Sequence, residues 1–159
     1  MNHEPIKERK VIFLQPKQYL KQAYRLNELI NSDLEELAEL KIFSENISSP
    51  NLSGMPSSGT RNTDSAFSRA VDKIIDLENH INEEIVRLVD LKKEIRSVIN
   101  EVIDGDEKLL LKYRYINFLG WEDICERMNV SIRTAHRIHA NALENVRIPE
   151  QNTVFSEQT

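Results

Sequence analysis

Apolar residues recur every three or four positions along most of the chain, which is the spacing of one face of an α-helix. The first such stretch follows Pro16 and continues to residues 43–47. Proline is tolerated in the first turn of a helix, so Pro16 is a suitable first residue. The pattern predicts one long helix with a single apolar stripe, formed by Ala23, Leu26, Ile30, Leu34, Leu37 and Leu40.

A second, longer stretch has a strict seven-residue repeat and is predicted to start at Thr63 or Asp64. Apolar residues stand at both repeating positions, with Glu84 as the one exception. This arrangement is typical of a coiled-coil seam, and β-branched residues at the first position with Leu at the fourth favour two strands. The first position holds Ile74, Ile81, Leu88, Ile95 and Val102, and the fourth holds Leu77, Glu84, Leu91 and Val98.

Residues 48–62 separate the two stretches and contain two prolines, two glycines and five serines. Such a composition predicts a loop, either a plain linker or a binding loop. We therefore expect residues 16–103 to form a long antiparallel helical hairpin or coiled coil. The shorter first helix covers only part of the second, which predicts a homodimer or higher homo-oligomer through these helices. In the alternative, a monomer completes its core with the C-terminal residues.

The C-terminal residues 104–148 have the pattern of a helix-turn-helix unit. We predict that Gly105 ends the preceding helix and that Asp106 caps a helix leading up to Leu119. A short amphipathic helix over residues 121–128 follows, with Ile124, Cys125 and Met128 facing inward, and Asn129, Val130 and Ser131 form a tight turn. Residues 1–15 are expected to form an extended or poorly ordered arm, and residues 149–159 a disordered tail.

The last predicted helix covers residues 132–146 and has two different faces. Its apolar face carries Ala135, Ile138, Ala142, Leu143 and Val146. His139 is expected at the margin of this core. The other face carries donors with long reach, which is the composition that a recognition helix uses against bases and phosphates. We predict DNA contacts from Arg133 and Arg137 first, from Thr134, His136 and Asn141 second, and from Ser131 and Arg127 to phosphate near the helix N-terminus.

Residues 122–131, with the sequence EDICERMNVS, resemble part of the fourth region of primary sigma factors. Residues 132–146 are similar to the recognition helix that follows there, and residues 108–115 to a helix upstream. From Tyr19 to Val146, the chain resembles the small phage and prophage regulators of the ArpU/RinA type, which join a helical N-terminal part to a sigma-like helix-turn-helix. This resemblance implies activation of late phage genes. The coiled-coil segment is expected either to set the geometry of a dimer or to contact RNA polymerase, which is a second candidate partner.

Charge is distributed unevenly along the chain. The net charge is −5, yet residues 108–147 contain seven basic and four acidic side chains. The C-terminal part is therefore the expected nucleic-acid face, and with so few cations a single copy would bind weakly at physiological salt. No apolar run of about 18 residues occurs, so no membrane partner is expected. The charged N-terminus lacks a signal sequence, which predicts the cytoplasm of a bacterial host cell.

The sequence contains no catalytic constellation, and we predict no enzyme activity, no cofactor and no metal. His136 and His139 stand one helical turn apart but lack a third ligand. Cys125 is the single cysteine and is expected in the core. The residues thus predict binding to double-stranded DNA, and the resemblance implies a transcriptional regulator of phage or prophage late genes. The alternatives are a DNA-packaging subunit of the small terminase kind and an adaptor that binds RNA polymerase.

Overall fold

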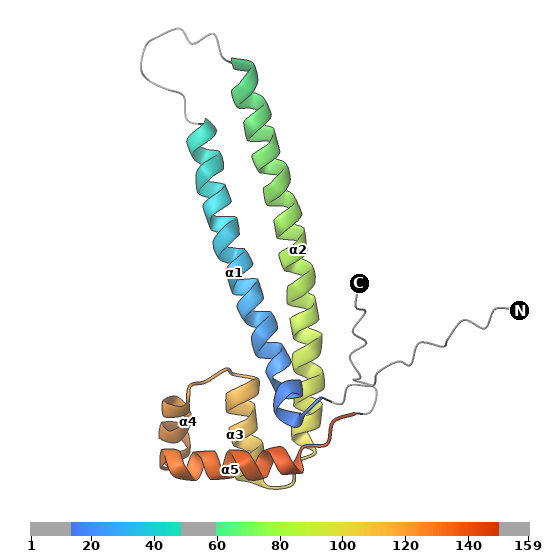
Figure 1. The fold of residues 1–159 in the computed structure, drawn as a ribbon, viewed down its shortest axis with the longest axis vertical. Coiled ribbons are helices and arrows are strands. Elements are labelled where there is room, and N and C mark those ends of the chain that lie inside the picture. Colours follow the sequence, from blue (N-terminus) through green and yellow to red (C-terminus); the bar gives the residue numbers. More distant parts are fainter. Residues whose placement is uncertain (1–13, 49–59, 150–159) are drawn as a thin grey trace, which may run out of the picture. The chain divides into compact units, whose positions relative to one another are not determined.

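The computed structural model describes residues 14–48 and 60–149, and these residues form helices without any strand. The all-α prediction is confirmed. Most of the predicted N-terminal arm, loop and tail lies outside the described residues. Figure 1 labels the five helices of the described part, which are α1 (Pro16–Ser48), α2 (Thr60–Asn100), α3 (Gly105–Tyr115), α4 (Trp121–Met128) and α5 (Ile132–Asn145).

The chain divides into two compact units, and both α1 and α2 contribute to each of them. Unit 1 contains the described residues up to Tyr24 and those from Lys92 onward, whereas unit 2 runs from Arg25 to Leu91. Helices α3, α4 and α5 belong entirely to unit 1. No helix of the described residues has both the length and the apolar character that a bilayer span requires.

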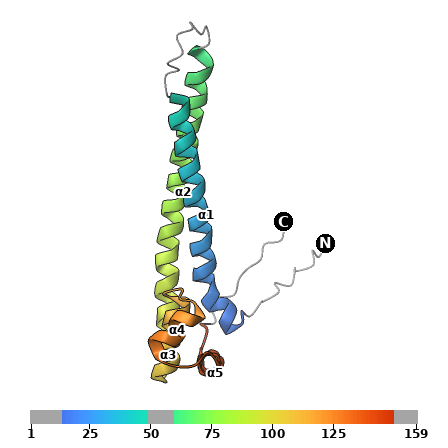
Figure 2. The same cartoon turned by 90° about the vertical axis from the view of Figure 1, so that its left-hand side faces the viewer.

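In unit 2, the predicted seam of α2 packs against α1. Figures 1 and 2 show the two helices running side by side. Ile81 lies in one buried cluster with Leu26, Ile30 and Leu37 of α1. The other seam residues packed against this cluster are Ile74, Leu77, Leu88 and Leu91. Two ion pairs join the same helices, with Lys41 Nζ 2.7 Å from Glu78 Oε1 and His80 Nε2 3.7 Å from Asp33 Oδ2.

One residue of the predicted α1 stripe is placed differently, because Leu34 is 44% exposed. The buried positions of α1 follow the alternating spacing of four and three residues that a coiled-coil seam requires. That spacing selects position 33 rather than 34, so the half-buried Asp33 takes the inward position. Further along α1, Ser44 is buried and donates its hydroxyl hydrogen to the carbonyl of Lys41 over 2.8 Å.

Unit 1 holds the deepest core of the described residues. It is built from the start of α1, the end of α2 and all three short helices. The largest fully buried side chains all belong to it, namely Tyr19, Leu20, Ile95, Ile99, Val102, Leu110, Leu111 and Ile124. The last part of the α2 seam is therefore buried with the C-terminal helices.

The connection from α2 to α3 corrects the predicted caps. Asp104, not Asp106, caps α3, since its Oδ1 accepts the backbone N–H of Glu107 over 2.9 Å. Gly105 is the first residue of α3, and its φ is not positive, so it does not end α2 in a left-handed conformation. Helix α2 also begins at Thr60, earlier than the predicted Thr63 or Asp64.

Candidate nucleic-acid interface

The turn between α4 and α5 has the geometry that its sequence predicts. Asn129 adopts a left-handed conformation, with φ of 52° and ψ of 48°. Asparagine is one of the few residues other than glycine that adopt this conformation readily. The backbone N–H of Asn129 bonds to the Glu126 carbonyl over 3.2 Å, and that of Val130 bonds to the Cys125 carbonyl over 3.0 Å. The turn therefore closes α4 and fixes where α5 begins.

Ser131 caps α5, as predicted. Its Oγ accepts the backbone N–H of Thr134 over 3.2 Å and lies 2.9 Å from the Thr134 hydroxyl. This arrangement satisfies one of the N–H groups that a helix start leaves without a partner. Two of the residues predicted to contact DNA thus bond to each other, and the first role of the Ser131 side chain is to cap the helix.

The inner face of α5 lies in the unit 1 core. Ala135 belongs to one buried cluster with Leu110 of α3 and Ile124 of α4, and Ala142 is fully buried. The partly buried side chains packed on this cluster include the predicted inward residues Cys125, Met128, Val130 and Ile138. These contacts hold α5 against both preceding helices.

His139 lies inside this core rather than at its margin, since it is 8% exposed. Its Nε2 shares a hydrogen bond of 2.8 Å with the Tyr115 hydroxyl. Burial, followed by the charges of Lys17, Arg114 and His136, lowers the pKa of His139 to about 4. Burial also raises the pKa of Tyr115 to about 12, against the opposing effect of Arg114. Both groups are therefore neutral at pH 7, and they link α3 to α5 without a buried charge.

The outer face of α5 carries the predicted donors at the surface. Arg133, His136, Arg137 and Asn141 are all exposed. Neither Arg133 nor Arg137 forms an ion pair within the part of the chain that the structure describes. Their positions, four residues apart, put both arginines on the same side of the helix, one turn from each other.

Two other predicted residues have aromatic neighbours. The exposed Arg127 of α4 has its guanidinium carbon 5.7 Å from the centroid of the Tyr113 ring. The His136 ring lies 4.2 Å from that of Trp121, centroid to centroid, and Trp121 also meets His139 edge-on at 5.1 Å. Trp121 thus contacts one histidine on the outer face of α5 and one on its inner face.

Two features near this unit have no signal in the sequence. Phe118 adopts a positive φ of 58°, although its side chain is not among those that favour a left-handed backbone. Arg114 Nη1 donates to the Leu119 carbonyl over 2.8 Å, and the guanidinium carbon lies 5.0 Å from the Trp121 ring centroid. Only the three-dimensional arrangement reveals that Arg114 holds the turn between α3 and α4.

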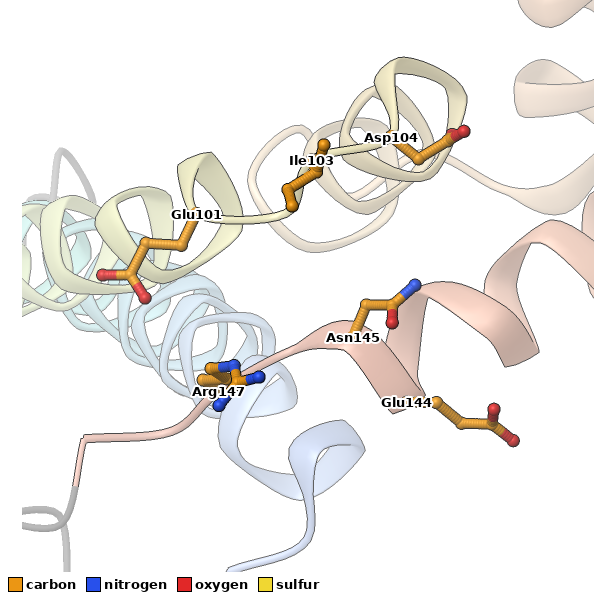
Figure 3. A pocket seen from close by; sticks show the side chains of 6 residues that line it. All are labelled: Glu101, Ile103, Asp104, Glu144, Asn145 and Arg147. Carbon is orange, nitrogen blue, oxygen red and sulfur yellow. The ribbon is translucent and has the colours of Figure 1, made fainter.

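A cavity of about 660 Å³ lies beside the α2–α3 connection, where Figure 3 shows its lining residues as sticks. They are Glu101, Ile103, Asp104, Glu144, Asn145 and Arg147. The lining contains three carboxylates and one guanidinium. This excess of negative charge disfavours phosphate, so this cavity is not part of the candidate interface. Among the described residues, no group of three or more His, Cys, Asp or Glu side chains is placed to hold a metal ion.

Residues 46–147 match the model of a family described as "Protein of unknown function (DUF1492)". The chain belongs to the DUF1492 family. The match covers α2, α3, α4 and α5 completely and includes only the end of α1. No curated protein and no solved structure matches the chain. The DUF1492 description carries no activity, so a functional assignment depends on the geometry of α4, α5 and their surroundings.

Proposed function

We propose that this protein is a sequence-specific DNA-binding transcription regulator of the phage or prophage type. Helices α4 and α5 would act as a helix-turn-helix, with α5 in the major groove. The observation that carries the proposal is the division of α5 into a buried face and an exposed cationic face. Ala135, His139 and Ala142 hold the helix in the core. Arg133 and Arg137 are exposed and form no ion pair with any residue that the structure describes.

Three local features support the comparison with the fourth region of sigma factors. A short helix of eight residues precedes the turn, Asn129 is left-handed, and Ser131 caps the next helix. The resemblance in residues 122–146 covers the same elements. A guanidinium that contacts guanine with two hydrogen bonds contributes about 1–3 kcal/mol of discrimination against other bases. Arg133 and Arg137 are the side chains that we assign to this role, with His136 and Asn141 beside them.

We also infer that the parts of α1 and α2 in unit 2 form an antiparallel hairpin. Along α1, Asp33 pairs with His80 and the later Lys41 pairs with the earlier Glu78. Leu40 shares a small cavity with Ala70, which comes earlier still in α2. Since α1 covers the seam, a homodimer needs another surface. Ile75 is 49% exposed, and Val86 and Val89 are each 62% exposed, so α2 offers apolar side chains for this contact. Two linked half-sites would raise the affinity through effective concentration.

A gel-shift experiment with phage promoter fragments tests the proposal. The full chain is expected to shift specific fragments, and Arg133→Ala combined with Arg137→Ala is expected to weaken binding by at least about 30-fold, since each contact is worth about 1–3 kcal/mol. The matched control removes two exposed cations from unit 2, Lys73→Ala and Arg87→Ala. It changes the net charge equally and should retain most of the affinity. Equal binding by both variants would contradict the assignment of α5.

The same preparation separates this proposal from the two alternatives. A dimer in solution agrees with a regulator that binds two half-sites, whereas a ring of eight or more copies would favour DNA packaging. RNA polymerase captured equally well by the wild type and by the double arginine variant, with no DNA shift, would favour an adaptor. A regulator that contacts both partners should capture polymerase and also shift DNA.

A further inference from the structure

A second cavity of about 410 Å³ lies in unit 1 beside the turn between α3 and α4. It shares no residue with the set predicted to contact DNA. Its lining combines the start of α1 with the end of α3 and the turn that follows α3. The residues from α1 are about 90 positions away in the chain from those of α3 and the turn. The lining residues are Lys21, Tyr24, Arg114, Tyr115, Phe118 and Gly120.

Two cations line this cavity, and a third lies over the ring of one of its lining residues. Lys21 and Arg114 line it, and Lys92 of α2 places its Nζ 4.2 Å from the centroid of the Phe118 ring. Within the described residues, none of the three forms an ion pair. Arg114 is positioned by the Leu119 carbonyl and the Trp121 ring, both of which are uncharged partners. Because a guanidinium has five N–H donors, most of them stay available after the single bond to Leu119.

The electrostatic surroundings of the cavity are positive. Burial and the nearby charge of Arg96 lower the pKa of Lys92. After burial, the charges of Lys17 and Arg114 also lower the pKa of His139, the partner of the lining residue Tyr115. One carboxylate, that of Asp123, lies close to the lining residue Gly120. A Cβ atom built onto this glycine would stand 3.4 Å from Asp123 Oδ2. The cations outnumber this carboxylate, and an anion entering here would be attracted.

The backbone of the turn is strained at the same place. Phe118 has a φ of 58°, which is unfavourable for a bulky residue and persists only where the surroundings impose it. Its ring meets the Tyr24 ring edge-to-face, with 5.7 Å between the centroids and 76° between the planes. Lys92 lies over the same Phe118 ring. These contacts keep the ring, and with it one wall of the cavity, in a fixed position.

We propose that this cavity binds a phosphate group, held by Lys21, Arg114 and Lys92 and bordered by the exposed Tyr24. Its volume suits a small phosphate ester. The phosphate belongs either to a free molecule, such as a nucleotide, or to the phosphodiester backbone of nucleic acid. The residues of this site belong to α1, α2, α3 and the turn after α3, and none lies on α5. The phosphate site therefore does not depend on the proposed function.

An NMR titration of the full chain at low ionic strength tests this site. The backbone amides of Phe118 and Gly120 report on the cavity, and the probes are orthophosphate, ATP and a duplex DNA in separate arms. We expect saturable shifts in at least one arm. Lys21→Gln should weaken that binding by about ten-fold, because it removes one charge-assisted hydrogen bond. Lys93→Gln, an exposed lysine of α2 in the same unit, is the matched control and should bind like the wild type.

The arms distinguish the two sources of phosphate. Saturation by orthophosphate or ATP assigns a free ligand, and saturation by duplex alone assigns a backbone contact, provided that Lys21→Gln weakens it. Lys21→Arg should retain binding, which separates the loss of charge from a loss of folding. The absence of saturation in every arm, or equal binding by Lys21→Gln and Lys93→Gln, would overturn the proposal. If Arg133→Ala with Arg137→Ala retains ATP binding, the site is independent of α5.

Discussion

The inner and outer faces of α5 differ in almost every physical property. The inner face is buried against α3 and α4, and its one polar side chain, His139, has a hydrogen-bond partner in Tyr115. The outer face is exposed and carries two arginines without ion pairs in the described residues. Buried polar groups are normally satisfied, whereas exposed cations gain little stability from a folded structure. The two outer arginines therefore contribute little to the stability of the fold.

The largest expected effect is a loss of stability when a side chain is removed from the buried cluster against which the inner face of α5 packs. Ile124→Ala removes a fully buried side chain from the cluster that holds α5. We expect the free energy of unfolding to fall by about 2–5 kcal/mol, as measured by chemical denaturation. The matched control is Ile132→Ala at the start of α5, where the side chain is 49% exposed and a much smaller change is expected. Similar losses for both variants would contradict the difference between the buried cluster that holds α5 and the exposed surface of that helix.

A smaller effect is expected from the hydrogen bond between His139 and Tyr115. The folded protein binds a proton on His139 only near pH 4, whereas the unfolded chain does so near the ordinary value of 6.5. Protonation therefore favours unfolding, and the stability that this group contributes above pH 6.5 is lost as the pH falls toward 4. His139→Gln should flatten this part of the stability profile, measured by denaturation between pH 7 and pH 4.

Two further variants sharpen this prediction. Tyr115→Phe should lower the free energy of unfolding at pH 7 by about 1 kcal/mol, because it removes the hydrogen bond. Asn141→Ala changes an exposed, uncharged side chain on the outer face and should leave the pH profile unchanged. A wild-type profile that matches that of His139→Gln between pH 7 and pH 4 would show that His139 is not held in its neutral form.

The smallest effect on stability is expected at the start of α5, where Ser131 caps the helix. Ser131→Ala removes the cap of α5 and should cost about 1 kcal/mol of stability, measured by thermal or chemical denaturation. Ser131→Asp can accept the same N–H and should retain most of that stability. If Ser131→Ala instead lost DNA affinity at unchanged stability, the hydroxyl would be a DNA contact and not chiefly a cap.

The sequence was sufficient for features that depend on local chemistry and periodicity. It predicted the turn at Asn129, the cap at Ser131 and the exposed arginines of α5, because each follows from neighbouring residues. It misplaced Leu34, since a stripe that steps by three or four residues can follow either of two adjacent positions. It also chose Asp106 over Asp104 as a cap, because both are suitable residues next to Gly105 and only the hydrogen bond decides between them.

Features that join distant parts of the chain had no such signal. The depth of His139 depends on Tyr115, which is 24 residues away, and the cavity beside Phe118 requires α1 to meet the turn after α3. Neither contact leaves a periodic trace in the sequence. The left-handed Phe118 is imposed by its surroundings, so its residue type gave no indication of it.

The central claim is that the outer face of α5 reads a DNA sequence. Selection of bound duplexes from a random library by the purified full chain tests it most directly. The wild type is expected to enrich one sequence motif, and the variant with Arg133→Ala and Arg137→Ala is expected to enrich none while remaining folded. Failure of the wild type to enrich any motif, or enrichment of the same motif by the double variant, would contradict the claim.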